Sequence, residues 1–192
     1  LTDSPEYRTV TQSIFIELFK SGAIIEDLRP NIYDPVEGTT IADAEVERLP
    51  RRTKLVDVEW TCEDGTNIVI STTRPELICA CGVVVVHPED DRYTHLVGQR
   101  IKLPMPVNGR ETSVEIQTHS SVKSDFGSGV LMVCSFGDQN DVAVFRELGL
   151  TPFQAINLEG RMTELAGPFA GQTVLEARTV SYTHLTLPTK LA

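Results

Sequence analysis

The chain has 192 residues, of which 41% are hydrophobic and 23% charged, and its formal net charge is −10. This composition suits one globular domain with additional segments, and no stretch approaches the roughly 18–20 apolar residues that span a bilayer. A domain this acidic is a poor general binder of nucleic acid, because phosphate contacts require local positive charge. The four cysteines form no CxxC pair and no zinc-ligand spacing with histidine, which favours reduced, packed thiols in a cytoplasmic protein.

The first predicted element is a helix over residues 5–20. It begins at a Ser-Pro pair suited to the N-cap and first helical position, and its apolar residues recur at helical spacing before a glycine. Residues 30–47 look irregular and then extended, and a Leu-Pro-Arg-Arg stretch follows them. We therefore place the first domain boundary after residue 47. The densest basic cluster is interpreted as a solvated linker and consists of Arg48, Arg51, Arg52 and Lys54.

The middle of the chain is predicted to be rich in β-strands. Two strands, at 54–60 and 67–72, flank an Asp-Gly turn signal typical of a hairpin. Further strands are expected at 82–87, 99–103, 113–117, 130–135 and 153–157. Short helices are expected at 89–97 and from Asp138 to Gly149. Together these elements predict a compact mixed α/β, β-rich domain.

The final segment, residues 181–192, does not follow from the sequence before it. A helix is expected around Glu176 to Arg178, but the threonine-rich run after it is a poor continuation. The tail resembles translated sequencing-adapter read-through, so we assign it as non-native; a genuine disordered C-terminus is the alternative. The predicted organisation is therefore 1–47, 48–180 and 181–192.

A polar segment, TTRPE, is the first candidate for a functional site. Thr72, Thr73, Arg74 and Glu76 follow a predicted strand, where a bend exposes polar groups at a sheet edge and binding pockets are often built. The alternative is a turn in which Arg74 and Glu76 are merely solvated. The pattern alone does not decide between them.

The second candidate is a pair of carboxylates at the start of a predicted helix. Asp138 and Asp141 lie three residues apart there, and the simpler interpretation is an N-cap and a first-turn acidic residue. The functional interpretation is a carboxylate pair directed at a cationic group of a substrate, and both roles are compatible. A separate HPEDDRY segment, which begins at His87, is interpreted as another helix start. GxSxG and P-loop motifs are absent from the sequence.

Four segments resemble, in order, the connective-peptide editing domain of the valyl-tRNA synthetases, a class I family. They are TTRPEL at 72–77, CGVVVVHPEDDRYTHLVGQRIKLP at 81–104, DFGSGVLMVCSFGDQNDVAVFRELGL at 125–150 and EGRM…AGPFAGQTVLEAR at 159–178. Residues 31–47 resemble the stretch that returns from the catalytic domain. Isoleucyl enzymes carry a TTTPWT-type segment and leucyl enzymes TTRPDT without HPEDDRY, so the valyl family is favoured. The SFGD segment resembles its archaeal branch.

The resemblance implies the editing fold, a short N-terminal piece of the catalytic domain, and hydrolysis of threonine wrongly esterified to valine tRNA. A hydrophobic pocket cannot strongly reject an isostere that only adds a hydroxyl, so a second, hydrolytic pocket is required. By resemblance, Asp141 pairs with the substrate ammonium and Asp138 places the amino acid or the attacking water. The implied substrate-binding residues are Thr72, Thr73, Arg74, Glu76 and Cys134.

The sequence also departs from that family in informative ways. Bacterial members carry Lys and Thr where this chain has Met132 and Cys134, which changes the groups available for hydroxyl recognition. HIGH and KMSKS motifs are absent, so we expect a fragment without cofactor or metal, with ATP and Mg needed only by the full-length enzyme. The expected partners are the mischarged 3′ end of valine tRNA and the missing catalytic and anticodon-binding domains. Alternatives are a leucyl or isoleucyl editing domain, or a non-catalytic module that binds aminoacylated RNA ends.

Overall fold

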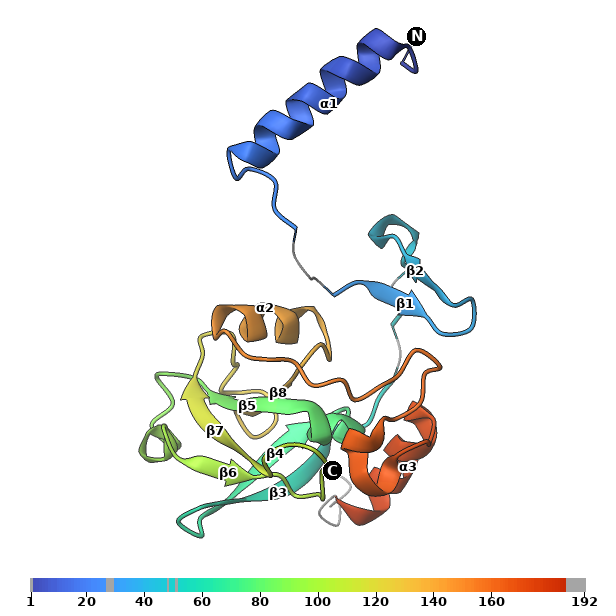
Figure 1. The fold of residues 1–192 in the computed structure, drawn as a ribbon. Helices are drawn as coiled ribbons and strands as arrows, with labels where there is room; N and C mark the ends of the chain where they lie inside the picture. The colour runs from blue at the N-terminus through green and yellow to red at the C-terminus, as the bar shows by residue number, and fades with distance from the viewer. Residues whose placement is uncertain (1, 27–29, 48, 51, 186–192) are drawn as a thin grey trace. The chain divides into compact units, whose positions relative to one another are not determined.

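The computed structural model describes residues 2–26, 30–47, 49–50 and 52–185 (Figure 1). The chain divides into two compact units, residues 1–31 and 32–192, rather than at the predicted boundary after 47. The hairpin of β1 (Ile32–Asp34) and β2 (Thr39–Ile41) is grouped with the second unit, where Pro35 in its turn lies against Gly160. Arg48 and Arg51 of the basic cluster lie outside the described residues.

The first unit contains helix α1 (Pro5–Lys20), which confirms the predicted helix. The hydroxyl of Ser4 caps it by accepting a hydrogen bond of 3.3 Å from the backbone nitrogen of Tyr7. None of its residues is buried, and its apolar side chains are about half exposed. Within its own unit, α1 is capped but buries no apolar face.

The second unit is built on a six-stranded sheet with the order β4-β3-β6-β7-β5-β8. The strands are β3 (Val56–Cys62), β4 (Asn67–Thr72), β5 (Cys81–Val86), β6 (Arg100–Lys102), β7 (Ser113–Thr118) and β8 (Val130–Cys134). All hydrogen-bonded pairs are antiparallel except β5 with β7. The end strands β4 and β8 approach each other, so the sheet curls into a barrel-like form. The predicted mixed, β-rich fold is confirmed at this level.

The burial pattern of each strand matches its position in the sheet. Buried and exposed residues alternate strictly along β3, as expected for a strand with one face in the core. In β5, by contrast, Val83 and Val85 pack on one side of the sheet and Val84 and Val86 on the other. A strand covered on both faces needs a continuous apolar run, which the sequence supplies.

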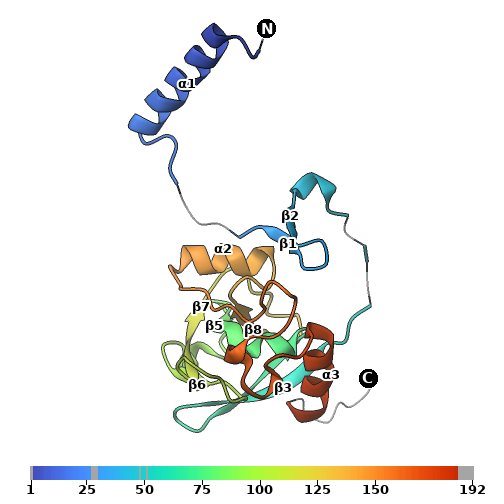
Figure 2. The same ribbon diagram turned by 45° about the vertical axis from the view of Figure 1, so that its right-hand side comes forward.

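Helix α2 (Gln139–Glu147) covers one face of β5 through Val144 and Phe145. A β-carbon at position 82 would lie 2.4 Å from the Phe145 ring, so Gly82 allows this close packing. Figures 1 and 2 show α2 beside β5 and β8, whereas α3 lies away from α2. Anchoring by Phe145 fixes the position of the N-terminus of α2, where Asp138 and Asp141 lie.

Two predicted elements are wrong. Residues 89–97 form turns and one 3-10 turn (Thr94–Leu96) rather than a helix, because Asp90 folds back to accept hydrogen bonds from the Arg92 side chain and backbone. The strand predicted at 153–157 is reduced to one isolated bridge between Ile156 and Met162. The remaining strands and α2 match their predicted positions within a few residues.

The C-terminal helix α3 (Val174–His184) runs past the predicted boundary at residue 180. Ser181 is buried and donates to the carbonyl oxygen of Ala177 over 2.7 Å, and Thr179 makes the same kind of bond to Leu175. Serine and threonine are weak helix formers, and in this run the hydroxyls of Thr179 and Ser181 bond to carbonyl oxygens one turn back. The rest of the tail, residues 186–192, lies outside the described residues.

Candidate functional site

The two predicted polar segments meet at Arg74. Strand β4 ends at Thr72, whose hydroxyl accepts a hydrogen bond of 3.0 Å from the Arg74 backbone, and the 3-10 helix η2 (Pro75–Ala80) follows. The Nη1 of Arg74 donates to the carbonyl oxygen of Gly137 over 2.7 Å. Because Gly137 lies in the turn between β8 and α2, the TTRPE segment and the carboxylate pair belong to one site.

A cavity of about 200 Å³ adjoins this contact. Its wall combines apolar side chains, chiefly Leu77, Phe153 and Ile156, with Arg74, Cys134 and the Ser135–Gly137 turn. That size suits an amino-acid side chain rather than a nucleoside, since cavities for larger ligands are typically about 300 Å³ or more. Thr72 is buried and Thr73 half-buried, and neither lines the cavity.

The turn between β8 and α2 is held in an unusual conformation by Ser135. Among the described residues it alone combines a side chain with a positive φ, 21°. Its buried hydroxyl donates to the Ala80 carbonyl oxygen over 3.0 Å and accepts from the Phe153 backbone over 2.7 Å. Such backbone strain persists only where the surroundings enforce it and is common at binding sites.

Asp138 and Asp141 flank this turn without lining the cavity itself. Asp138 is the exposed N-cap of α2, and its Oδ1 accepts from the backbone nitrogens of Asn140 and Asp141 over 2.7 and 3.0 Å. Asp141 folds back against Gly137, where a β-carbon would lie 2.3 Å from its Oδ2. Glycine at 137 therefore lets the Asp141 carboxylate reach the edge of the cavity.

The electrostatic environment sets Asp141 apart from ordinary surface carboxylates. Burial raises its pKa to about 7, the negative charge of Asp138 adds to this, and the backbone of Cys134 and the charge of Arg74 oppose it. Near neutral pH this carboxyl therefore carries a proton for much of the time in the ligand-free protein. Burial removes the carboxylate charge from water, and a cation placed beside it stabilises that charge and favours the ionised form.

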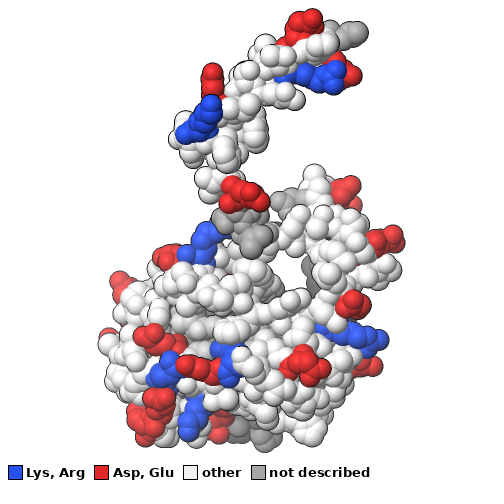
Figure 3. All heavy atoms as spheres, in the orientation of Figure 1, with Lys and Arg blue, Asp and Glu red and all other residues white. Residues whose placement is uncertain are grey.

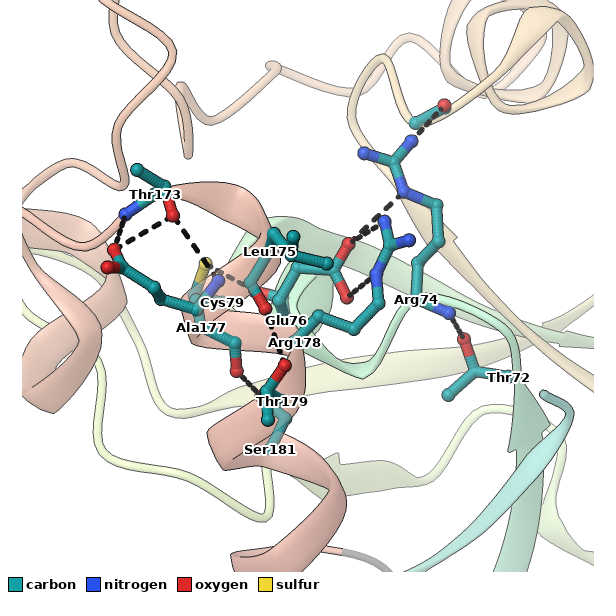
Figure 4. A network of polar contacts seen from close by, with 12 residues as sticks. Thr72, Arg74, Glu76, Cys79, Thr173, Leu175, Ala177, Arg178, Thr179 and Ser181 are labelled. Carbon is teal, nitrogen blue, oxygen red and sulfur yellow. Dashed lines mark hydrogen bonds and ion pairs between the residues drawn. The ribbon is translucent and has the colours of Figure 1, made fainter. Parts of the chain in front are cut away.

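Glu76 requires a correction. It was expected to bind substrate, but its side chain is fully buried and both oxygens accept hydrogen bonds from Arg178 of α3, at 2.7 and 3.1 Å (Figure 4). Arg74 approaches the same carboxylate through Nε at 3.3 Å. Glu76 therefore holds Arg74 instead of contacting a ligand. Arg178 is not predictable from local sequence, because no local pattern joins residues separated by 102 positions.

Cys134 lies at the end of β8 opposite Cys81 and lines the cavity. A hydrogen bond with the Cys81 thiol, together with full burial, raises the pKa of Cys134 well above its usual value. It therefore presents a neutral thiol, which is a weak hydrogen-bonding group. Met132, on the same strand, is buried in the core.

A larger cavity, of about 410 Å³, lies beside β6 and β7 and contains none of the predicted site residues. Its arginines are already engaged. Arg100 binds Glu111 and Ser113, and Arg110 donates to the Cys79 carbonyl oxygen and stacks 3.8 Å above the Phe153 ring. We therefore favour the smaller cavity, which is lined by the predicted site residues Arg74 and Cys134 and by Gly137, against which Asp141 lies.

Two further findings concern only the described part of the chain. No three side chains of His, Cys, Asp or Glu are grouped there in a way that would hold a metal ion. None of its helices has the length and apolar character needed to cross a membrane.

No family model matches the sequence. The chain is, however, 44% identical over 178 residues to the valine–tRNA ligase of Aeropyrum pernix and 43% identical to that of Nanoarchaeum equitans. These matches cover 92% of the chain. The chain corresponds to a region of the valine–tRNA ligases. It spans only about a fifth of their length, since it covers 21% and 23% of the two relatives.

A third valine–tRNA ligase, from Methanopyrus kandleri, is 41% identical over 183 residues, and the match covers 20% of that protein. Among solved structures, the fold is similar to that of LeuRS from Agrobacterium radiobacter in a ternary complex with tRNA and LeuAMS. The TM-score is 0.52, the identity 18%, and the similarity covers 95% of this chain and 31% of the LeuRS chain. The suspected relation to valine–tRNA ligase is therefore confirmed by sequence, and the structure adds a shared fold.

Proposed function

We propose that this chain is the editing region of a valine–tRNA ligase and hydrolyses threonine wrongly esterified to valine tRNA. One observation carries the proposal. The Asp141 carboxylate of α2 and the Arg74 guanidinium meet at Gly137, beside a cavity of about 200 Å³. Negative and positive groups at the mouth of a small cavity suit an aminoacyl ester, which has an ammonium at one end and a nucleotide phosphate at the other.

In the proposed complex, Asp141 binds the α-ammonium of threonine. This carboxylate is partly desolvated, and burial raises its pKa to about 7, so binding of the ammonium shifts the carboxyl toward its ionised form. The charge-assisted contact fixes the amino acid with its carbonyl toward the Gly137 turn. Asp138, which is exposed and held by its capping bonds, places the amino acid or the attacking water.

The proposed reaction is direct hydrolysis without a protein nucleophile. Water attacks the ester carbonyl, the carbon–oxygen bond to the ribose breaks, and the 3′-terminal hydroxyl leaves with a proton from the water. Arg74 lies where its positive charge stabilises the developing oxyanion or the adjacent phosphate. The proposed contact to the threonine hydroxyl is the neutral Cys134 thiol at the cavity wall. Thr72 takes part indirectly, by holding the Arg74 backbone.

The proposal assigns amino-acid activation, with its ATP and Mg, to other parts of the ligase, and it requires no cofactor in this region. It places the protein in the cytoplasm, with valine tRNA as its partner. The net charge of −10 and the interspersed acidic and basic groups in Figure 3 give this region little general affinity for RNA. We therefore propose that the catalytic and anticodon-binding domains supply most of the tRNA affinity.

The decisive experiment compares release of amino acid from threonyl- and valyl-tRNA(Val) by the purified chain, with leucine and isoleucine tRNAs carrying noncognate amino acids as further substrates. The proposal predicts rapid loss of threonine and slow loss of valine. Hydrolysis confined to a leucine or isoleucine tRNA would reassign the substrate. Binding of threonyl-tRNA without hydrolysis would instead identify a non-catalytic module for aminoacylated RNA ends.

A further inference from the structure

Glu76 is the buried centre of an ion network that joins α3 to the candidate site (Figure 4). Its side chain has no exposed surface, and Arg178 donates to it from Nε and Nη2 over 3.1 and 2.7 Å. Arg74 reaches the same carboxylate only through Nε, at 3.3 Å. A carboxylate taken out of water requires such compensation, and here Arg178 provides the greater part.

Arg178 and Arg74 share the Glu76 carboxylate unequally. Because Arg178 occupies both carboxylate oxygens, Arg74 is left with Nη1 on the Gly137 carbonyl oxygen at 2.7 Å. Its Nη2 is bonded to none of the described residues, and the side chain lines the cavity. About a third of the Arg74 side chain remains exposed, so this guanidinium is held in place and still accessible.

We infer that Arg178 is a positioning residue for the site: by holding Glu76 from α3, it prevents Arg74 from collapsing onto that carboxylate and keeps its guanidinium at Gly137 and the cavity. Without Arg178, Arg74 is the remaining cation of this network. A two-pronged pair between arginine and carboxylate is stronger than the single long contact seen here. Arg74 would therefore turn away from Gly137 to form one.

The displacement of Arg74 can be followed without substrate, through the pKa of Asp141. The groups that act on the Asp141 carboxyl are Asp138, Arg74 and, from β8, the backbone and thiol of Cys134. Of these, Arg74 is the positive charge that lowers the Asp141 pKa. If Arg74 leaves Gly137, the pKa of Asp141 rises. The inference rests on the proposed function for its substrate, but this titration tests it independently.

The experiment compares Arg178→Gln with the double variant Glu76→Gln/Arg178→Gln in the full chain. Carbon-detected NMR follows the Asp141 carboxyl in the ligand-free protein, and hydrolysis of threonyl-tRNA is measured in parallel. Arg178→Gln should raise the Asp141 pKa by about 0.5–1 and reduce the hydrolysis rate about tenfold or more. The double variant should restore both, because a glutamine no longer attracts Arg74 strongly but still accepts from its Nε.

The matched control is Arg161→Gln, which removes an exposed arginine that donates to the Gly171 carbonyl oxygen just before α3. It should change neither measurement. An unchanged Asp141 titration in Arg178→Gln, or a double variant no better than the single one, would show that Arg178 only packs α3 and would overturn the inference. If the single variant does not fold, the double variant decides: a titration like that of the unmodified chain supports the inference, and a shifted one contradicts it.

The outcomes also separate this inference from the proposed function. An unmodified chain that hydrolyses no threonyl-tRNA contradicts the editing proposal, while the Asp141 titration still tests the role of Arg178. Conversely, an active chain in which Arg178→Gln leaves the titration and the rate unchanged keeps the editing proposal and removes Arg178 from the site.

Discussion

Helices α1 and α2 have similar local signals and different surroundings. Both begin with a side chain that caps the first turn, Ser4 in α1 and Asp138 in α2, and both carry apolar residues at helical spacing. Yet every residue of α1 is exposed, whereas α2 is anchored to β5 by Val144 and Phe145. Both helices are capped locally, but it is the tertiary anchor of α2 that fixes the position of its N-terminus.

The anchor of α2 gives the largest expected effect on stability. Phe145→Ala should cost about 3–5 kcal/mol of unfolding free energy, because a fully buried ring that packs on Gly82 is removed. The matched change in α1, Phe15→Ala, should alter it by less than about 0.5 kcal/mol, because Phe15 is 56% exposed. Urea denaturation followed by the fluorescence of buried Trp60 measures both. Equal costs would remove the contrast between the two helices.

The carboxylate on α2 gives an intermediate effect that depends on pH. The Asp141 pKa rises from 3.8 in a free side chain to about 7 in the fold, chiefly through burial. Between these values the unfolded chain binds fewer protons than the folded one, so this group lowers stability as pH rises and the cost is complete above pH 7.

Asp141→Asn should therefore stabilise the chain by about 1–3 kcal/mol at pH 8 and by almost nothing at pH 4. Denaturation midpoints of the two proteins at both pH values provide the measurement. A difference that does not vary with pH would show that the Asp141 carboxyl is not desolvated as described.

Substitution of the N-cap of α2 should have the smallest effect on stability. It also separates the capping role of Asp138 from a role in hydrolysis. Asp138→Ala should cost about 1 kcal/mol of stability, because the bonds to the backbone nitrogens of Asn140 and Asp141 are lost. Asp138→Asn should retain most of that stability, since asparagine also caps well, but it lacks the charge. If Asp138→Asn hydrolyses threonyl-tRNA as fast as the unmodified chain, Asp138 is a cap alone.

Elements with strong local signals were predictable from the sequence. The alternation in β3, the apolar run of β5 and the capped start of α2 each appear where the pattern placed them. The 89–97 segment failed because an Asp90–Arg92 contact competes with helix formation, and 153–157 failed because that strand finds only one bridge partner. In the first case a side-chain contact outweighed helix propensity, and in the second a pairing partner was missing.

The candidate site was predictable in part. The sequence singled out Arg74, Asp138 and Asp141, and the structure brings them together at Gly137. It did not indicate that Glu76 is buried or that Arg178 holds it, because that pair depends on how α3 packs against η2. A local pattern can show that a residue is polar and lies in a bend, but not whether another segment covers it.

The most direct test of the central claim is the rate at which Asp141→Ala releases threonine from threonyl-tRNA(Val), relative to the unmodified chain. The account predicts loss of at least about 100-fold in rate, because substrate positioning depends on the Asp141–ammonium contact. The circular dichroism spectrum and the denaturation midpoint at pH 7 should show that the fold remains. Hydrolysis by Asp141→Ala at the rate of the unmodified chain would contradict the account and leave the carboxylate pair with a structural role only.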